Sequence, residues 1–172
     1  MAGKKKSFVR IVDVDTSRVR KLFVGMINRS NDFKPVFRWM FQALQKAHMQ
    51  NFQTQGQTDG SPWKPLDPQY ASWKLENYGD KGILVRTGDL QDSLTMNSAR
   101  GAVRDMGRRT AYFGTKLSYA KFHQNGTINM AERRPVFLPN LMARQTARAV
   151  GEHIVHNSVG VVYPYLKNGF VN

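Results

Sequence analysis

The segment YAKFHQNGT, residues 119–127, holds the residue types that most readily suggest a reactive centre. His123 stands between an aromatic residue and an amide, directly before the turn-forming pair Asn125-Gly126. An imidazole exchanges protons near neutral pH, so a histidine in such a loop is a candidate acid or base. Because the segment contains no carboxylate and no second metal ligand, we interpret His123 as a structural residue whose ring makes hydrogen bonds within a loop.

The other histidines and the carboxylates offer weaker candidates. His153 and His156 are three residues apart on a predicted helix, which is the spacing of a two-ligand metal face or of two surface histidines. No third ligand accompanies them, and His48 lies on an apolar stripe, as a histidine at the core edge would. The acids are scattered, and no hydrolase, phosphate-binding or metalloprotease motif is present. We therefore predict no catalytic residue, no cofactor and no metal. A metal-dependent nuclease, which needs clustered acids, is the enzymatic alternative.

The charge of the chain is strongly unbalanced. Twenty-six Lys and Arg oppose 12 Asp and Glu, for a net charge of +14 in 172 residues. Such an excess favours a polyanionic partner: nucleic acid, an acidic protein face or anionic lipid. The basic residues are dispersed and do not alternate with aromatics, which disfavours sequence-specific recognition. The candidate contacts with DNA in a channel or with an acidic partner are Arg100, Arg104, Arg108, Arg109, Arg133 and Arg134.

The composition indicates a globular chain, since 41% of its residues are hydrophobic and 11% aromatic. There is no cysteine, so disulfides are excluded and a reducing cytosol fits. The basic start is not followed by an apolar run, and no stretch approaches the length of a membrane span. We expect no signal peptide and no membrane partner.

The clearest element is a long helix from residue 33 to residue 52. Apolar residues recur there at three- and four-residue steps, and Asn31 and Asp32 are suited to cap its start. A loop rich in Pro and Gly follows, and Trp63 and Leu66 are expected to anchor it. Asp67-Pro68 then marks the start of a short helix that ends at Gly79.

The remaining segments are shorter. Residues 7–15 predict a strand or extended arm, and residues 16–30 a helix with a break at Gly25. Thr87 is expected to cap a helical turn that places Leu90 and Leu94 on one face, and residues 94–114 to form a small antiparallel meander. A second good helix spans residues 140–160, with a stripe formed by Ala143, Ala147, Val150 and Ile154.

This order of elements predicts an α+β fold. A small antiparallel sheet would pack with the long helix and the C-terminal helix, and the termini would form extended arms. We expect one domain over residues 1–172, with an N-terminal arm and lead-in at 1–30, a core at 31–158 and a tail at 159–172. The arms are candidates for extending the sheet of a neighbouring copy.

Four motifs in order resemble the phage virion morphogenesis family, typified by the Mu-like G protein. PWKPLDPQY matches a W-x-P-L signature, and ILVRTGDLQDSL matches I-L-x-x-T-G-x-L-x-x-S. YAKFHQNG matches Y-A-x-x-H-Q-x-G, and RRPVFLP is similar to a P-x-R-P-F-L segment, although Val136 separates Pro135 from Phe137. The similarity runs roughly from Phe33 to Ile154. The matched residues are Trp63, Leu66, Tyr70, Thr87, Gly88, Leu90, Ser93, Tyr119, Ala120, His123, Gln124 and Gly126, called the motif residues below.

The resemblance implies a non-enzymatic virion protein that completes the tail or forms the neck between tail and DNA-filled head. Its expected state is a ring of six or twelve copies, built in the cytoplasm of the bacterial host. The ring would contact neighbouring connector and tail proteins, and packaged DNA would pass nearby without sequence specificity. A tail-terminator or head-completion protein of the same junction is one alternative. A basic, non-specific nucleic-acid-binding protein is another.

Overall fold

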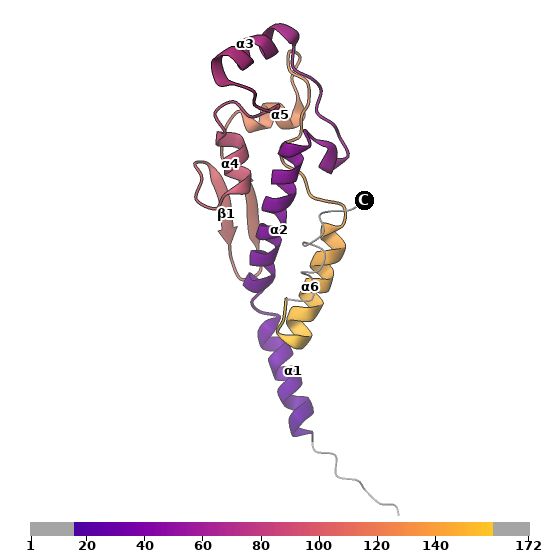
Figure 1. Cartoon of the computed structure of the whole chain (residues 1–172). Coiled ribbons are helices and arrows are strands. Elements are labelled where there is room, and N and C mark those ends of the chain that lie inside the picture. The colour runs from indigo at the N-terminus through magenta and orange to yellow at the C-terminus, as the bar shows by residue number, and fades with distance from the viewer. Residues whose placement is uncertain (1–15, 160–172) are drawn as a thin grey trace, which may run out of the picture.

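The computed structural model describes residues 16–159, and its elements build an α+β fold around one long helix (Figure 1). The predicted fold class is confirmed, whereas the strand predicted at residues 7–15 lies outside the described residues. The elements are α1 (Ser17–Arg29), α2 (Lys34–Gln53), the 3-10 helix η1 (Gln57–Asp59), α3 (Pro68–Tyr78), α4 (Asp89–Thr95), β1 (Ala102–Met106), β2 (Ala111–Thr115), α5 (Ala120–Asn125) and α6 (Met142–His156).

Helix α2 is the axis of the core, and nine of its residues are buried. Val36, Trp39, Ala43 and Leu44 form one apolar cluster with residues of α6. The predicted helix is confirmed, but its cap differs from the expectation. The N-cap position is Phe33, whose side chain cannot cap, and Asp32 instead accepts a hydrogen bond from the Lys34 amide at 3.0 Å.

Helix α6 lies alongside α2, but it turns a different face inward from the one predicted (Figure 1). Its buried residues are Met142, Ala149 and His153, whereas Ala143 and Ala147 are exposed. Of the predicted stripe, Val150 packs against the first apolar cluster and Ile154 is half-buried, so the prediction was wrong at Ala143 and Ala147. Two alanines carry too little apolar area to decide which face packs. Met142 and the ring of His153 contribute more, and they set the orientation of the helix.

Within residues 16–159 the sheet is one hairpin in which β1 pairs with β2 in antiparallel register, with Arg104 opposite Phe113. The predicted meander was wrong at its start, since residues 94 and 95 complete α4 rather than a strand. Phe113 packs against both apolar clusters of the core, so the hairpin links them.

The loop after α2 is fixed to the core by Trp63. The indole is 6% exposed, meets Phe52 edge-on, and donates from Nε1 to the Arg134 carbonyl at 3.2 Å. Gly56 makes this approach possible: it has φ +93°, and a Cβ there would lie 2.6 Å from the indole and 2.5 Å from the Ser61 carbonyl oxygen. The loop then enters α3, where Asp67 caps the amides of Gln69 and Tyr70 as predicted.

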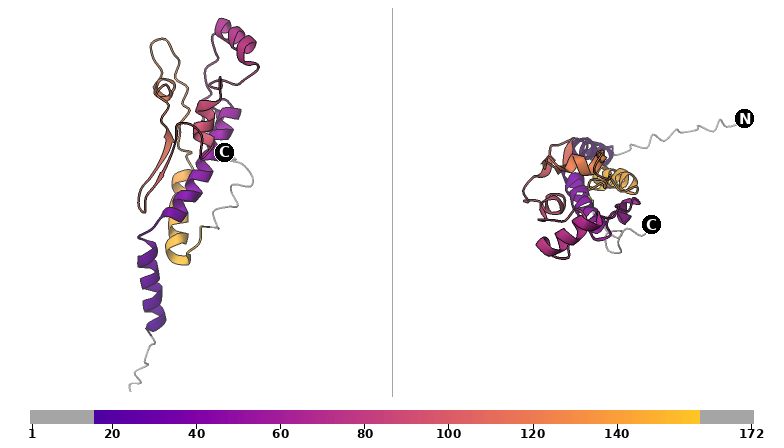
Figure 2. Two further views of the ribbon diagram at one scale, coloured as in Figure 1. Left: turned by 90° about the vertical axis from the view of Figure 1, so that its left-hand side faces the viewer. Right: turned by 90° about the horizontal axis from the view of Figure 1, so that it is seen from above.

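Helix α1 projects from the opposite end of the molecule to α3 (Figures 1 and 2). The break expected at Gly25 is absent, and residues 17–29 of the expected arm form a continuous helix with no buried residue. Arg29 fastens its end, because Nε donates to the Ile154 carbonyl at 2.6 Å and Nη2 to the Val155 carbonyl at 3.2 Å. No helix within residues 16–159 has the length and apolar character that crossing a bilayer requires.

Candidate functional site

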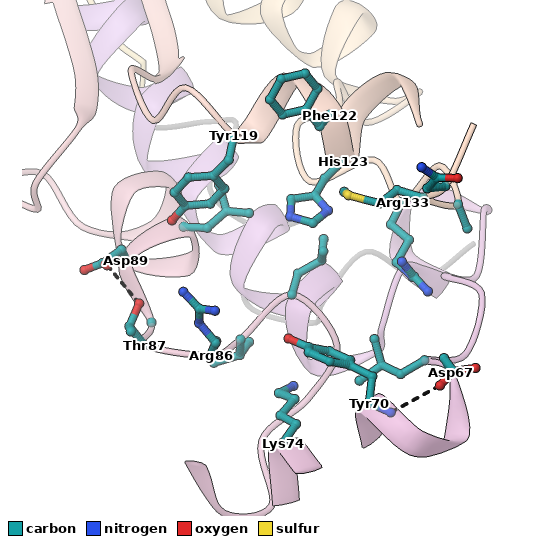
Figure 3. Close-up of a pocket in the computed structure, with 18 residues that line it drawn as sticks. Asp67, Tyr70, Lys74, Arg86, Thr87, Asp89, Tyr119, Phe122, His123 and Arg133 are labelled. Carbon is teal, nitrogen blue, oxygen red and sulfur yellow. Dashed lines mark hydrogen bonds between the residues drawn. The ribbon is translucent and has the colours of Figure 1, made fainter. Parts of the chain in front are cut away.

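The motif residues converge on a cleft of about 680 Å³ between α3, α4 and α5 (Figure 3). Those that line it come from three separate stretches, residues 66–70, 87–90 and 119–123, so the fold alone brings them together. Figure 3 shows Tyr119, Phe122 and His123 on one wall, with Tyr70 and Lys74 facing them from α3. The motif residues that line the cleft are Leu66, Tyr70, Thr87, Gly88, Leu90, Tyr119 and His123.

The floor of the cleft is formed by the start of α4. Gly88, rather than Thr87, occupies the N-cap position, and its φ of +102° is a conformation that favours glycine. The expected cap by Thr87 was therefore wrong. The Thr87 hydroxyl instead donates to the Asp89 carboxylate at 2.8 Å, which fixes the loop before the helix. Leu90 is buried beneath, as predicted.

His123 lies in α5 at the wall of the cleft, with its ring packed edge-on against Tyr119 at 6.2 Å. Its backbone carbonyl accepts from the Arg133 amide at 2.8 Å. Burial, with a smaller contribution from the Arg133 guanidinium, lowers the pKa of the imidazole below its usual value, so the ring is neutral at pH 7. Its Nδ1 is buried without a hydrogen-bond partner among the described residues. Within residues 16–159, no carboxylate bonds the ring and orients it as a general base would require.

The cationic side chains at the cleft serve mainly as cross-links between loops. Lys74 is 4% exposed, and its Nζ donates to the Lys81 and Gly82 carbonyls at 2.8 and 2.6 Å. Burial is the main cause that lowers the pKa of this amine. Arg133 donates to the Lys64 and Pro65 carbonyls at 2.7 and 2.8 Å. Both groups therefore stabilise the walls by cross-linking backbone carbonyls.

The other motif residues support the cleft from behind. Gln124 forms a two-way amide pair with Val136, donating to its carbonyl at 2.9 Å and accepting from its amide at 3.1 Å. The buried Ser93 hydroxyl donates to the Leu90 carbonyl and bonds Thr115 across to the hairpin. Ala120 is buried, and Gly126 ends α5. Trp63 lies in the adjacent apolar cluster with Leu90 and Ala120.

Arg86 also lines the cleft, but it did not emerge from the sequence. It occupies one of the variable positions of the I-L-x-x-T-G motif, so the motif carries no signal for it. Its guanidinium lies 5.6 Å from the centre of the Tyr78 ring, where it joins the end of α3 to the loop before α4.

The six candidate DNA or partner contacts divide into three pairs. Arg104 is partly buried: it lies 4.0 Å over the Phe113 ring and donates to the carbonyls of Ser93 and Gly114. With Arg133, it serves the fold. Arg109 donates to the Asn31 side chain and Arg134 pairs with Glu132. Arg100 and Arg108 are exposed, and they present their charge to solvent.

Two of the other histidines, His48 and His153, serve the core, whereas His156 is exposed. His48 is fully buried between Phe113 and Phe137, with Nδ1 donating to the Leu44 carbonyl at 2.7 Å. Burial lowers its pKa to about 4. His153 donates from Nε2 to the Asp32 carbonyl at 2.8 Å and so is committed to the backbone. Across residues 16–159, no group of three or more His, Asp or Glu is placed to hold a metal ion.

Comparison with known proteins gives one match. A family model described as the phage virion morphogenesis family matches residues 14–153. No curated protein and no solved structure matches the chain significantly. The matched range contains all the motif residues and every element that lines the cleft.

Proposed function

The chain belongs to the phage virion morphogenesis family and has a structural role in building the phage particle, and we propose that within this role it completes the tail and joins it to the DNA-filled head. The protein would be located at the neck or upper tail of the virion and assembled in the host cytoplasm. We also propose that the protein has no catalytic activity.

The main support for this proposal is the structural role of the motif residues. They come from separated segments of a family-matched chain, and they build a cleft in which the cations Lys74 and Arg133 are bonded to backbone carbonyls. A catalytic site would instead direct a base, a nucleophile or a metal into the cavity. A cleft lined by apolar, aromatic and charged side chains suits contact with another protein.

The proposed assembly is a ring of six or twelve copies that contacts connector proteins on the head side and tail proteins on the other. A closed ring requires that two different surfaces of each copy meet. DNA entering the tail would pass through it, and exposed cations such as Arg100 and Arg108 could face the DNA without reading its sequence. A tail-terminator or head-completion role at the same junction uses the same properties.

A second candidate is a basic protein that binds nucleic acid without sequence preference. The net charge of +14 and the exposed Arg100 and Arg108 favour it. The two candidates differ in salt dependence, because duplex binding through phosphates weakens steeply as salt rises.

The test is to delete the gene and image the particles that remain. We expect filled heads beside unattached tails, and we expect the wild-type gene supplied in trans to restore joined virions. Supplying Tyr112→Gln, an exposed change on β2 away from the cleft, serves as the matched control and should also restore them. Normal, infectious particles from the deletion strain would refute the proposal.

A further inference from the structure

We propose that α1 of one copy docks on α3 of a second copy, so that the chain associates head to tail through its two ends. This inference deepens the proposed function, because it names the surfaces that would join neighbouring subunits. It rests on the chemistry of two helices that contribute almost nothing to the core of their own chain.

Helix α1 presents an apolar face that no element within residues 16–159 covers along most of its length. Val19, Phe23 and Ile27 are spaced four residues apart, which places them on one side of the helix. Phe23 is 59% exposed and Ile27 is 61% exposed. A helix of 13 residues is marginally stable in water by itself, and such helices normally gain stability by burying their apolar face. Contact with α6 at the Arg29 end leaves that face open.

Helix α3 is the second element without an apolar anchor. Its single buried residue is Lys74. Tyr70 and Trp73 stack at 5.6 Å and are 40% and 43% exposed, and Leu75 is 56% exposed. Large aromatic side chains that are partly exposed and already stacked in place are typical anchors of protein interfaces.

The charges of the two helices are complementary. Helix α1 carries Arg18, Arg20, Lys21 and Arg29 and no acid. In this strongly basic chain, residues 67–92 are an acidic exception, because five carboxylates there outnumber three cations. Glu76 and Asp80 lie in and just after α3. A second α1 would repel the first, whereas α3 offers both apolar area and opposite charge.

The two helices cannot meet within one chain, because they lie at opposite ends of an elongated molecule (Figures 1 and 2). Their lengths match, since 13 and 11 residues span about 20 and 16 Å at the helical rise per residue. Contact between different surfaces on successive copies is heterologous, and it produces a ring when the rotation closes.

The test uses two variants, each with substitutions on one of the two proposed surfaces. The α1 variant carries Phe23→Gln and Ile27→Gln, and the α3 variant carries Trp73→Gln and Glu76→Gln. Sedimentation velocity over a concentration series is expected to show self-association of the wild-type protein. Each variant alone should associate at least about tenfold more weakly, because a few central anchors carry most of the binding energy of an interface. Tyr112→Gln, which removes an exposed aromatic from β2, should associate like the wild type.

Mixing the two variants gives the sharpest result. Each retains the surface that the other has lost, so the mixture should form a one-to-one dimer that grows no further. Trp73 fluorescence supplies a second readout: emission should shift to the blue as the wild-type protein associates, and Trp73→Phe should lose that shift. Circular dichroism checks that each variant keeps its helices.

Several results would overturn the inference. These are a wild-type chain that stays monomeric up to its solubility limit, variants that associate as well as the wild type, or a mixture that remains monomeric. If the wild-type protein bound vesicles of phosphatidylcholine and phosphatidylserine but did not self-associate, α1 would be assigned to contact with anionic lipid instead. None of these results affects the deletion phenotype, so the proposed function is judged separately.

Discussion

Helices α2 and α1 follow one another in the chain, and both are amphipathic, yet the molecule uses them in opposite ways. Helix α2 buries nine residues and organises both the sheet and α6, whereas α1 buries none. Helix α3 resembles α1 in this respect. The comparison teaches that an amphipathic pattern predicts a helix and a buried face, but does not say whether the partner belongs to the same chain.

The three tryptophans give the strongest test of this contrast between helices that pack in the core and helices that do not. Trp39 and Trp63 are 2% and 6% exposed, whereas Trp73 in α3 is 43% exposed. We expect Trp39→Ala or Trp63→Ala to lower the free energy of unfolding by about 3–5 kcal/mol, because each leaves a large cavity. Trp73→Ala should change it by less than about 0.5 kcal/mol. Urea unfolding of the three variants is the measurement. A Trp63→Ala protein with unchanged melting would show that the loop is not anchored by this residue.

The buried His48 in α2 should make the stability of the core depend on pH. In the folded chain the pKa of this imidazole is about 4, whereas in the unfolded chain it has its usual pKa of about 6.5. The unfolded state therefore binds more protons in this window, and stability falls as pH decreases from 6.5 to 4. The contribution is about 3 kcal/mol, and it does not grow below pH 4.

Urea unfolding at a series of pH values measures this contribution. His48→Gln should show a shallower fall in stability between pH 6.5 and 4 than the wild type. His156→Gln, a change at an exposed position of α6, should retain the wild-type fall. Equal slopes in the wild type and His48→Gln would contradict the assignment.

The arginines give a smaller contrast between fold and surface. Arg104→Ala removes hydrogen bonds to the Ser93 and Gly114 carbonyls and the contact with Phe113, so we expect a loss of about 2 kcal/mol in unfolding free energy. Arg108→Ala should be nearly neutral for stability, since Arg108 is exposed. Chemical unfolding compares them, and equal losses would mean that Arg104 is not structural.

The smallest effect is expected at two glycines of different conformation. Gly88→Ala forces a side chain into φ +102° and should cost about 1–2 kcal/mol. Gly151→Ala lies inside α6 with open space around it and should stabilise the chain by about 0.5–1 kcal/mol. Thermal melting would separate the two, and a stabilising Gly88→Ala would contradict the role given to this turn.

Local signals predicted the parts of the fold that are decided locally. Asp67 and Pro68 mark the start of α3, and the apolar rows of α2 mark its length, because capping and periodicity act within a few residues. The face of α6 was mispredicted at Ala143 and Ala147, because two alanines carry too little apolar area to decide which side packs against α2. The motif residues were identified from the sequence, but their meeting in one cleft was not, because Leu66, Thr87 and His123 are brought together by the fold.

The bonds of Arg29 have a mechanical consequence. Helix α1 is joined to α2 covalently through residues 30–33, and Arg29 also ties it to the last carbonyls of α6. A force applied to α1 is therefore transmitted to the core both through α2 and through α6, the two helices that pack together in the first apolar cluster. The load is shared between backbone and side chain, so a strain applied at this tip is delivered to the most tightly packed part of the molecule.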